Sequence, residues 1–213
     1  HQKLIEESPS PGVSSVMRKK MAQGAVRLFQ ELDYRGAGTI EFLVQGEEFY
    51  FMEVNARLQV EHPVSEWVTG TDMVREQILA CTEGRLELDP RAVSLQGWAM
   101  ECRINALSPG RVTALHLPGG PGVRFDTCLY PGCMVPPYYD ALVGKLIVHA
   151  PNREQVLARM DRALGELRIQ GIATNQDEQM GILRDSRFRS GQFGTAYYVE
   201  WEAARPKETK HEG

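Results

Sequence analysis

The chain has 213 residues, of which 42% are hydrophobic and 24% are charged, and this is the composition of an ordinary soluble protein with an ample core. Its formal net charge of −4 gives no electrostatic reason to expect nucleic acid or an anionic membrane as a partner. No apolar run approaches the length of a membrane span, and no signal sequence opens the chain. The four cysteines lack the spacing of a zinc site or a disulfide framework, which favours a reduced, cytoplasmic compartment.

The first part of the chain predicts a helix, a hairpin and a second helix. Residues 14–34, SSVMRKKMAQGAVRLFQELDY, place apolar side chains at helical spacing behind serines that can cap the helix. Residues 36–55, GAGTIEFLVQGEEFYFMEVN, contain two strand-like runs around a turn at Gly46. A helix is expected at about 71–83, with Gly84 placed to end it. The chain starts without a methionine, as though in mid-element, which suggests a fragment.

The second part of the chain predicts short strands followed by helices. From about residue 92 onward, strand-like runs are broken by Gly and Pro. An amphipathic helix is expected within residues 152–169, and a shorter helix should follow residue 175. The longer helix is predicted to bury one apolar face, formed by Val156, Leu157, Met160, Leu164 and Leu167.

A row of polar residues in residues 51–64, FMEVNARLQVEHPV, is the most informative feature of the sequence. Every second residue from position 53 to position 61 is polar or charged, and the residues between them are apolar. This period of two predicts an extended strand whose alternate side chains share one face. The polar face would carry Glu53, Asn55, Arg57, Gln59 and Glu61.

The hairpin places a second acid beside this row. A three-residue loop at 46–48 would pair residue 45 with 49 and residue 43 with 51, and would set Glu41 directly across from Glu53. Like charges at directly opposed positions repel, so a cation is expected between them. Mg²⁺ binds carboxylate oxygens and keeps room for phosphates, which favours a Mg²⁺–nucleotide site. The alternative, a solvated hairpin face with two acids, is equally open from the hairpin alone.

The remaining members of the row suggest an anion site with a base beside it. Asn55 can supply a neutral oxygen to a second ion. The guanidinium of Arg57, next to Gln59, suits the paired oxygens of a carboxylate, a carbonate or a phosphate. Glu61 is placed to accept a proton from an anion that Arg57 holds.

The sequence resembles the biotin carboxylase family of the ATP-grasp superfamily over nearly its whole length. The motif EVNARLQVEHPV distinguishes this family from other ATP-grasp ligases. The segments that carry the resemblance are HQKLIEESPSPGVS, residues 35–84, AMECRINAL, LPGGPGVRFD and VPPYYDALVGKLIVHA. The resemblance implies an α+β fold in which the C-terminal part of an ATP-grasp domain, with a mixed antiparallel sheet, precedes a biotin carboxylase C-terminal domain. We expect domains at 1–86 and 92–204 and a polar, disordered tail at 205–213.

The resemblance also implies an activity, namely ATP- and bicarbonate-dependent carboxylation of biotin on a carrier protein through carboxyphosphate. Glu61 would remove the bicarbonate proton, and Arg103 in ECRIN would bind biotin and stabilise its enolate. Bicarbonate would be bound by Lys3, Arg57, Gln59 and the backbone of Val60. The nucleotide would be bound by His1, Glu41, Leu43 and Glu53, and Mg²⁺ or Mn²⁺ by Glu41, Glu53 and Asn55.

The implied partners are a biotin carboxyl carrier protein, a carboxyltransferase and a second copy of the chain, with neither nucleic acid nor membrane. The acceptor of the carboxyl group is left open, since a carboxyltransferase selects it. Two departures from the family are visible: the stretch between INA and SPG is short, and the N-terminal domain and the glycine-rich lid are absent from the sequence. Two alternatives therefore stay open, a non-catalytic module of such a carboxylase and another ATP-grasp carboxylase or ligase.

Other conspicuous residues have plainer interpretations. Tyr138 and Tyr139 are expected to pack rather than to catalyse. His149 lies in a strand-like run and is interpreted as a hydrogen-bonded or surface residue rather than a ligand.

Overall fold

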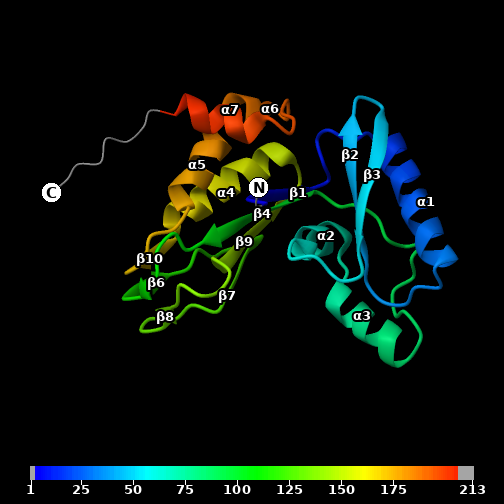
Figure 1. The fold of residues 1–213 in the computed structure, drawn as a ribbon, viewed down its shortest axis with the longest axis horizontal. Helices are drawn as coiled ribbons and strands as arrows, with labels where there is room; N and C mark the ends of the chain where they lie inside the picture. Colours follow the sequence, from blue (N-terminus) through cyan, green and yellow to red (C-terminus); the bar gives the residue numbers. More distant parts are fainter. Residues whose placement is uncertain (1–2, 206–213) are drawn as a thin grey trace.

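The computed structural model describes residues 3–205, in which two groups of elements lie side by side (Figure 1). His1 and nearly all of the tail predicted at 205–213 lie outside the described residues. The elements up to the middle of the chain are β1 (Ile5–Ser8), α1 (Ser15–Glu31), β2 (Thr39–Gln45), β3 (Glu48–Asn55), α2 (His62–Thr69) and α3 (Met73–Thr82). Those that follow are β4 (Trp98–Asn105), β5 (Gly110–Arg111), β6 (Ala114–His116), β7 (Val123–Thr127), β8 (Met134–Val135), β9 (Leu142–Ala150), α4 (Arg153–Glu166), β10 (Arg168–Gln170), α5 (Gln176–Arg184), α6 (Ser186–Ser190) and α7 (Tyr197–Ala204).

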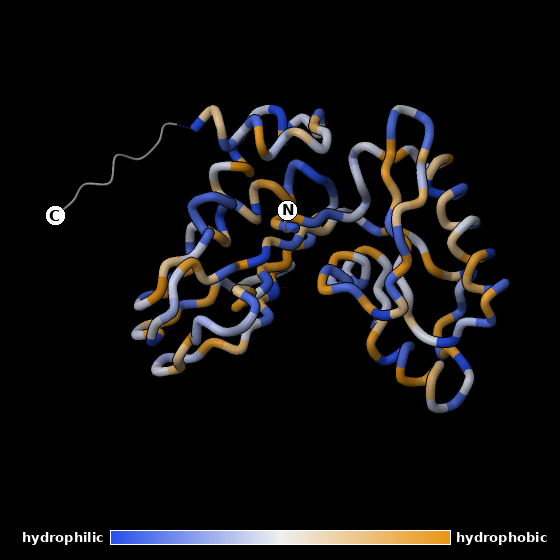
Figure 2. Tube along the Cα trace, in the orientation of Figure 1, coloured by the Kyte–Doolittle hydropathy of each residue, from blue (hydrophilic) through white to orange (hydrophobic). Residues whose placement is uncertain are grey.

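The predicted first helix is confirmed as α1, and its cap is the expected one. Ser14 Oγ accepts a hydrogen bond of 3.2 Å from the backbone N–H of Met17, which satisfies one of the free donors of the first turn. Only Met17 is buried, whereas Val16 is 65% and Leu32 is 62% exposed. Hydrophobic and hydrophilic residues are accordingly mixed along this helix (Figure 2). The apolar side of α1 therefore has little cover from the described residues.

The hairpin β2–β3 confirms the predicted opposition of Glu41 and Glu53, but by a different register. The predicted three-residue loop is wrong, because Gln45 pairs with Glu48 across a two-residue turn. Gly46 has the positive φ of 59° that such tight turns require. Leu43 consequently lies opposite Tyr50, and a β-bulge next to Glu41 then restores the expected pair.

The strand predicted to run through the whole polar row is too long. β3 ends at Asn55, which pairs with Thr39, the first residue of β2. Beyond this pair no partner strand remains to accept the backbone hydrogen bonds, so residues 56–61 form bends and turns. The helix α2, which the alternation concealed, begins at His62 with Pro63 in its first turn.

A four-stranded antiparallel sheet with the order β1-β4-β9-β7 forms the centre of the second group. β1 comes from the start of the chain and pairs with β4, so that Glu6 lies opposite Glu101. One face of the sheet packs against α4, whose predicted apolar face is confirmed. The buried residues of that face are Val156, Leu157, Met160 and Leu164, and Leu167 follows them at the end of the helix.

The opposite face of the sheet contacts α2. Val64 and Val68 of α2 are buried against Ala99 of β4. His149 of β9 stacks on Trp67 with ring centroids 5.4 Å apart. Its Nε2 lies 2.9 Å from the carbonyl oxygen of Gln96, which agrees with its interpretation as a hydrogen-bonded residue. These contacts fix α2, the helix that follows the polar row, to the four-stranded sheet.

The paired tyrosines do not pack as predicted. Tyr138 is 86% and Tyr139 is 82% exposed in the turn between β8 and β9. The other predicted elements are present, including α3 with its cap at Asp72 and α5 after Asn175. Within residues 3–205, no helix has both the length and the apolar composition needed to cross a bilayer.

The burial of α4 leads to a stability prediction. Leu164→Ala in the complete protein should lower the free energy of unfolding by about 2–5 kcal/mol, because it leaves a cavity in a closed core. Gln155→Ala, at an exposed position of the same helix, should change it by less than about 0.5 kcal/mol. Equilibrium denaturant unfolding measures both values, and equal effects would contradict the described packing of α4.

Candidate functional site

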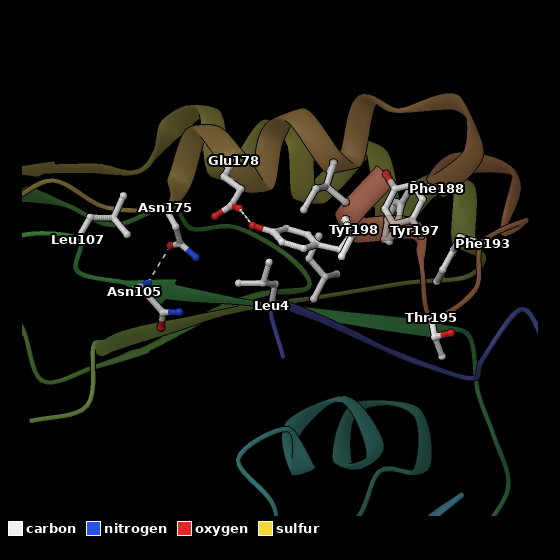
Figure 3. Close-up of a pocket in the computed structure, with 13 residues that line it drawn as sticks. Leu4, Asn105, Leu107, Asn175, Glu178, Phe188, Phe193, Thr195, Tyr197 and Tyr198 are labelled. Atoms are coloured by element: carbon white, nitrogen blue, oxygen red, sulfur yellow. Dashed lines mark hydrogen bonds between the residues drawn. The ribbon is translucent and has the colours of Figure 1, made fainter. Parts of the chain in front are cut away.

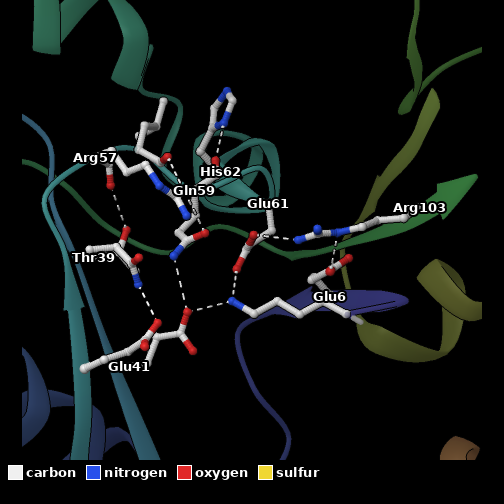
Figure 4. A network of polar contacts seen from close by, with 12 residues as sticks. Glu6, Thr39, Glu41, Arg57, Gln59, Glu61, His62 and Arg103 are labelled. Atoms are coloured by element: carbon white, nitrogen blue, oxygen red, sulfur yellow. Dashed lines mark hydrogen bonds and ion pairs between the residues drawn. The ribbon is translucent and has the colours of Figure 1, made fainter. Parts of the chain in front are cut away.

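Five of the predicted site residues converge in one polar network (Figure 4). Lys3 Nζ lies 2.8 Å from Glu41 Oε1 and 2.7 Å from Glu61 Oε1. Gln59 Nε2 donates to the same Glu41 oxygen at 3.2 Å. Arg103 Nη2 lies 2.8 Å from Glu61 Oε2. Glu61 is thus held between an ammonium and a guanidinium that are far from it in the sequence.

Three separate elements supply these groups. Lys3 precedes β1, Arg103 lies on β4, and Glu61 is the residue directly before α2. The pairing of β1 with β4 brings the two cations to one end of the sheet, where the backbone N–H of Arg103 donates to the carbonyl of Leu4 at 3.0 Å. The packing of α2 on the same face of the sheet then carries Glu61 to them.

The opposite charges in the network stabilise the ionised forms of Glu61 and Lys3. Burial alone would raise the pKa of Glu61, but the hydrogen bond from Lys3 and the charge of Arg103 lower it below its ordinary value. Burial would likewise lower the pKa of Lys3, yet its hydrogen bonds to Glu41 and Glu61 raise it overall. Glu61 is therefore a carboxylate at neutral pH, and Lys3 is an ammonium.

The predicted metal ligands lie on the hairpin beside this network. Glu41 and Glu53 face one another across the strands, and Asn55 Nδ2 donates to Glu53 Oε1 at 2.8 Å. Residues 3–205 contain no cluster of three or more His, Cys, Asp and Glu side chains that could hold a metal. Two carboxylates with one amide oxygen still form a donor set that suits Mg²⁺, provided that the Asn55 amide turns its oxygen inward.

The other predicted residues occupy the margin of the network. Arg57 Nη1 lies 3.2 Å from Gln59 Oε1, so its guanidinium points toward the predicted anion site. The carbonyl oxygen of Val60 accepts a hydrogen bond of 2.9 Å from Lys145 Nζ. Leu43 is a half-exposed residue of β2. His1 lies outside the described residues.

An open cavity of about 530 Å³ adjoins the network. Its lining includes Lys3, Glu6, Gln59, Glu61 and Ser65. This volume is in the range of small-molecule sites. The cavity therefore offers room for a small anion and a larger ligand group next to the charged side chains.

Sequence reasoning missed three charged residues next to this site: Glu6, Glu101 and Lys145. Arg103 lies opposite Lys145 on β9, and Glu101 lies two residues before it on the same face of β4. Each of the three interrupts a strand-like run, and a charge in a buried strand is uncommon. The sequence therefore shows these unusual charges, but it does not show that β1, β4 and β9 pair and bring them together.

A second cavity of about 510 Å³ lies between the sheet and the helices α5–α7 (Figure 3). Its lining is mostly apolar, and the Glu178 carboxylate already accepts a hydrogen bond from the Tyr198 hydroxyl. The backbone N–H of Asn105 donates a hydrogen bond of 2.8 Å to Asn175 Oδ1. Among the described residues, no Lys or Arg lines this cavity, so it is a weaker candidate for an anion-dependent reaction.

Comparison with known proteins places both halves of the chain. Residues 101–200 match the family model for the biotin carboxylase C-terminal domain, and residues 1–88 match that for the carbamoyl-phosphate synthase L chain, ATP binding domain. A biotin carboxylase of Allochromatium vinosum is 46% identical over 198 residues, which are 90% of this chain and 44% of that protein. Over most of its length, the chain is therefore similar to proteins named biotin carboxylase.

Two further biotin carboxylase relatives show how much of such a protein the chain covers. A pyruvate carboxylase component of Methanothermobacter thermautotrophicus is 41% identical over 94% of this chain and 43% of its own length. The biotin carboxylase domain dimer of Hydrogenobacter thermophilus 2-oxoglutarate carboxylase, solved with MgADP, ADP and bicarbonate, superimposes with a TM-score of 0.90 at 37% identity, over 94% of this chain and 46% of that one. The chain thus spans less than half the length of these relatives.

The position of Lys3 leads to a prediction about Glu61. Lys3→Met removes the ammonium that Glu41 and Glu61 share, so the pKa of Glu61 should rise from its lowered value. Carbon-13 NMR titration of glutamate carboxyls in the complete protein measures this, with Glu61→Gln identifying the signal. Lys20→Met, at an exposed position of α1, should leave the titration unchanged. An unaltered Glu61 titration in Lys3→Met would contradict the described network.

Proposed function

We propose that this chain forms the bicarbonate and biotin side of a biotin carboxylase. The reaction is ATP- and bicarbonate-dependent carboxylation of biotin on a biotin carboxyl carrier protein, through a carboxyphosphate intermediate. The observation that carries the proposal is Glu61, a carboxylate held between Lys3 and Arg103 beside an open cavity. The similarity to a biotin carboxylase over 90% of the chain and the match of residues 101–200 to the biotin carboxylase C-terminal domain support it.

In the first half-reaction, the chain binds bicarbonate and removes its proton. Lys3, Arg57, Gln59 and the backbone of Val60 bind the anion, since ammonium, guanidinium and amide groups suit its oxygens. Glu61 accepts the proton, which makes bicarbonate a better nucleophile toward the γ-phosphate of ATP. A bicarbonate oxygen forms a bond to the γ-phosphorus as the bond between that phosphorus and the ADP oxygen breaks, which gives carboxyphosphate and ADP.

Nucleotide and metal are bound on the hairpin in this proposal. Glu41 and Glu53, with Asn55, would hold Mg²⁺ or Mn²⁺, which would neutralise phosphate charge during the transfer. Leu43 would contact the nucleotide from β2, and His1 would contact it from the start of the chain. The bound MgADP and bicarbonate of the Hydrogenobacter thermophilus domain support both ligands.

In the second half-reaction, Arg103 acts on biotin. Carboxyphosphate releases CO₂, and the remaining phosphate takes the ureido proton of biotin. The resulting enolate carries negative charge, and the permanently charged guanidinium of Arg103 stabilises it while it attacks CO₂. Arg103 is suited to this role because only 16% of its side chain is exposed, so its charge is weakly screened.

The wider setting is also part of the proposal. We assign the chain to a protein with domains at 1–86 and 92–204 that works as a homodimer with a carrier protein and a carboxyltransferase. A reduced, cytoplasmic compartment is supported by the four free cysteines. The acyl or keto-acid acceptor is left open, since relatives include components of pyruvate and 2-oxoglutarate carboxylases.

A non-catalytic module of such a carboxylase is the second candidate. It is favoured by the coverage of less than half of each relative and by exposed apolar residues on α1 and the hairpin. Against it stands the joined network of Lys3, Glu41 and Glu61, which an interaction module has no need to retain. Another ATP-grasp ligase is disfavoured by the match of residues 101–200 to the biotin carboxylase C-terminal domain.

The role of Glu61 as the base can be tested directly. Glu61→Gln preserves shape but cannot accept a proton, so kcat for bicarbonate-dependent ATP hydrolysis should fall by roughly 10²-fold to 10⁴-fold. Nucleotide affinity should change little, because the described ion pairs of Glu61 are with Lys3 and Arg103 and not with the predicted metal ligands Glu53 and Asn55. Steady-state kinetics of the complete enzyme and separate nucleotide titrations provide the two measurements.

Glu166→Gln, on the exposed side of α4, is the matched control and should behave as the parent enzyme. Near-normal kcat in Glu61→Gln would remove the assignment as base. A large loss of nucleotide affinity would instead move Glu61 to the metal site.

The role of Arg103 separates the two half-reactions. Arg103→Ala should lower carboxylation of free biotin on the order of 10²-fold or more, because the enolate loses its fixed cation. Part of the bicarbonate-dependent ATP hydrolysis should persist, since Lys3 still contacts Glu61. Arg162→Ala, exposed on α4, is the control. A parallel loss of both activities would show that Arg103 also binds bicarbonate.

A further inference from the structure

Two carboxyl groups, those of Glu6 and Glu101, lie close to Arg103 on the face of the four-stranded sheet that contacts α2. Glu6 of β1 is directly opposite Glu101 of β4, and directly opposed side chains in antiparallel strands are about 5 Å apart at Cβ. Glu101 is fully buried, and only 11% of the Glu6 side chain is exposed. None of the reaction steps above uses either residue.

The Arg103 guanidinium connects this pair to the reaction site. Its Nε lies 2.8 Å from Glu6 Oε1, while Nη2 lies 2.8 Å from Glu61 Oε2 (Figure 4). The side chain is therefore held by two carboxyl groups, Glu6 on β1 and Glu61 directly before α2, and both residues line the cavity. Among the described residues, the buried oxygens of Glu101 and of Glu6 have no hydrogen-bond partner, and Glu6 keeps only its ion pair with Arg103. A fully ionised carboxylate in that position would be costly.

The charged groups around the pair determine how many protons it holds. Lys3 and Glu61 face Glu6 from the ends of neighbouring segments, Arg103 lies beside it, and Lys145 faces Glu101 from β9. Burial raises the pKa of Glu6 to about 7 although Arg103 opposes this rise. Burial and the charge of Glu6 raise the pKa of Glu101 to about 8 although Lys145 opposes this rise. Near neutral pH, the two adjacent buried carboxyls are therefore not both ionised.

We propose that Glu6 is a positioning residue for Arg103, and that Glu6 and Glu101 share one proton while it does so. This inference rests on the proposed function. When Glu61 accepts a proton, its attraction for Arg103 falls, but Glu6 still holds the guanidinium at the place where biotin must bind. The shared proton leaves one negative charge in the pair, enough to hold Arg103 without the repulsion of two buried carboxylates.

A purely structural role explains the pair less well. Buried carboxyls without hydrogen-bond partners do not stabilise a fold, and apolar residues of similar volume often replace buried ionic groups at no cost. Glu7 offers the comparison, since it lies on the opposite face of β1. Its carboxylate accepts hydrogen bonds of 2.8 Å from both Trp98 and Arg153, which is a satisfied structural arrangement.

The kinetic test uses Glu6→Gln in the complete enzyme, with free biotin as substrate. The ratio of biotin carboxylation to bicarbonate-dependent ATP hydrolysis should fall on the order of 10-fold to 10²-fold, because Arg103 is no longer fixed for the second half-reaction. Profiles of kcat between about pH 6 and 9 should lose an ionisation that the parent enzyme shows. Glu6→Asp retains the charge and should restore part of the ratio.

Glu7→Gln is the control, because it alters the same strand without touching Arg103. It should lower stability but keep both the ratio and the pH profile. A parental ratio and a parental pH profile in Glu6→Gln would overturn the positioning role. Equal changes in Glu7→Gln would also overturn it, since they would show an effect of strand destabilisation alone.

The shared proton has a test that does not depend on activity. Infrared spectra of the parent protein at neutral pH should contain a protonated carboxyl band that disappears in Glu101→Gln, or shifts in Glu6→Gln. The absence of such a band would overturn the shared proton. If the parent enzyme shows neither bicarbonate-dependent ATP hydrolysis nor biotin carboxylation, the proposed function and the role of Glu6 in it fail, whereas the infrared result still decides the state of the pair.

Discussion

The pairing of β1 with β4 is the constraint on which the site depends. It joins the start of the chain to a strand about a hundred residues later, in a register that sets Glu6 opposite Glu101. The same register places Lys3 at the end of the sheet where Arg103 projects. Without it, Glu61 would lack the ammonium of Lys3, and Arg103 alone would oppose the rise in the pKa of Glu61 that burial causes.

The two faces of this sheet are used differently. Ile5, Cys102 and Leu146 point to the face that packs on α4, where a continuous apolar core fixes the strands. The other face carries charged side chains across the strands, and Arg103 there lies opposite Lys145. The apolar face thereby supplies the rigidity that a charged site needs, because closely packed strands hold their side chains in defined positions.

The lowered pKa of Glu61 has two opposite consequences for its proposed role as a base. Lys3 and Arg103 lower its pKa, which keeps it ionised but makes it a weaker base. In the proposed reaction, the same two cations would attract the anionic substrate into the cavity. The bound anion would then share the positive charge with Glu61, which would make the carboxylate a better proton acceptor.

The sequence by itself determined the features that depend on near neighbours. The cap at Ser14 and the buried face of α4 follow from local spacing, and the motif EVNARLQVEHPV carried the resemblance to biotin carboxylases. The opposition of Glu41 and Glu53 was also expected, but it arises from a two-residue turn and a β-bulge that the spacing did not predict. Only the tertiary structure ended β3 at Asn55, because a strand continues only where a partner offers hydrogen bonds. The tertiary structure also decided that Glu6 and Glu101 lie opposite one another, close to Arg103. No periodic pattern in the sequence relates these two positions. They lie side by side because β1 pairs with β4, and buried apolar side chains on the opposite face of the sheet hold the two strands in place.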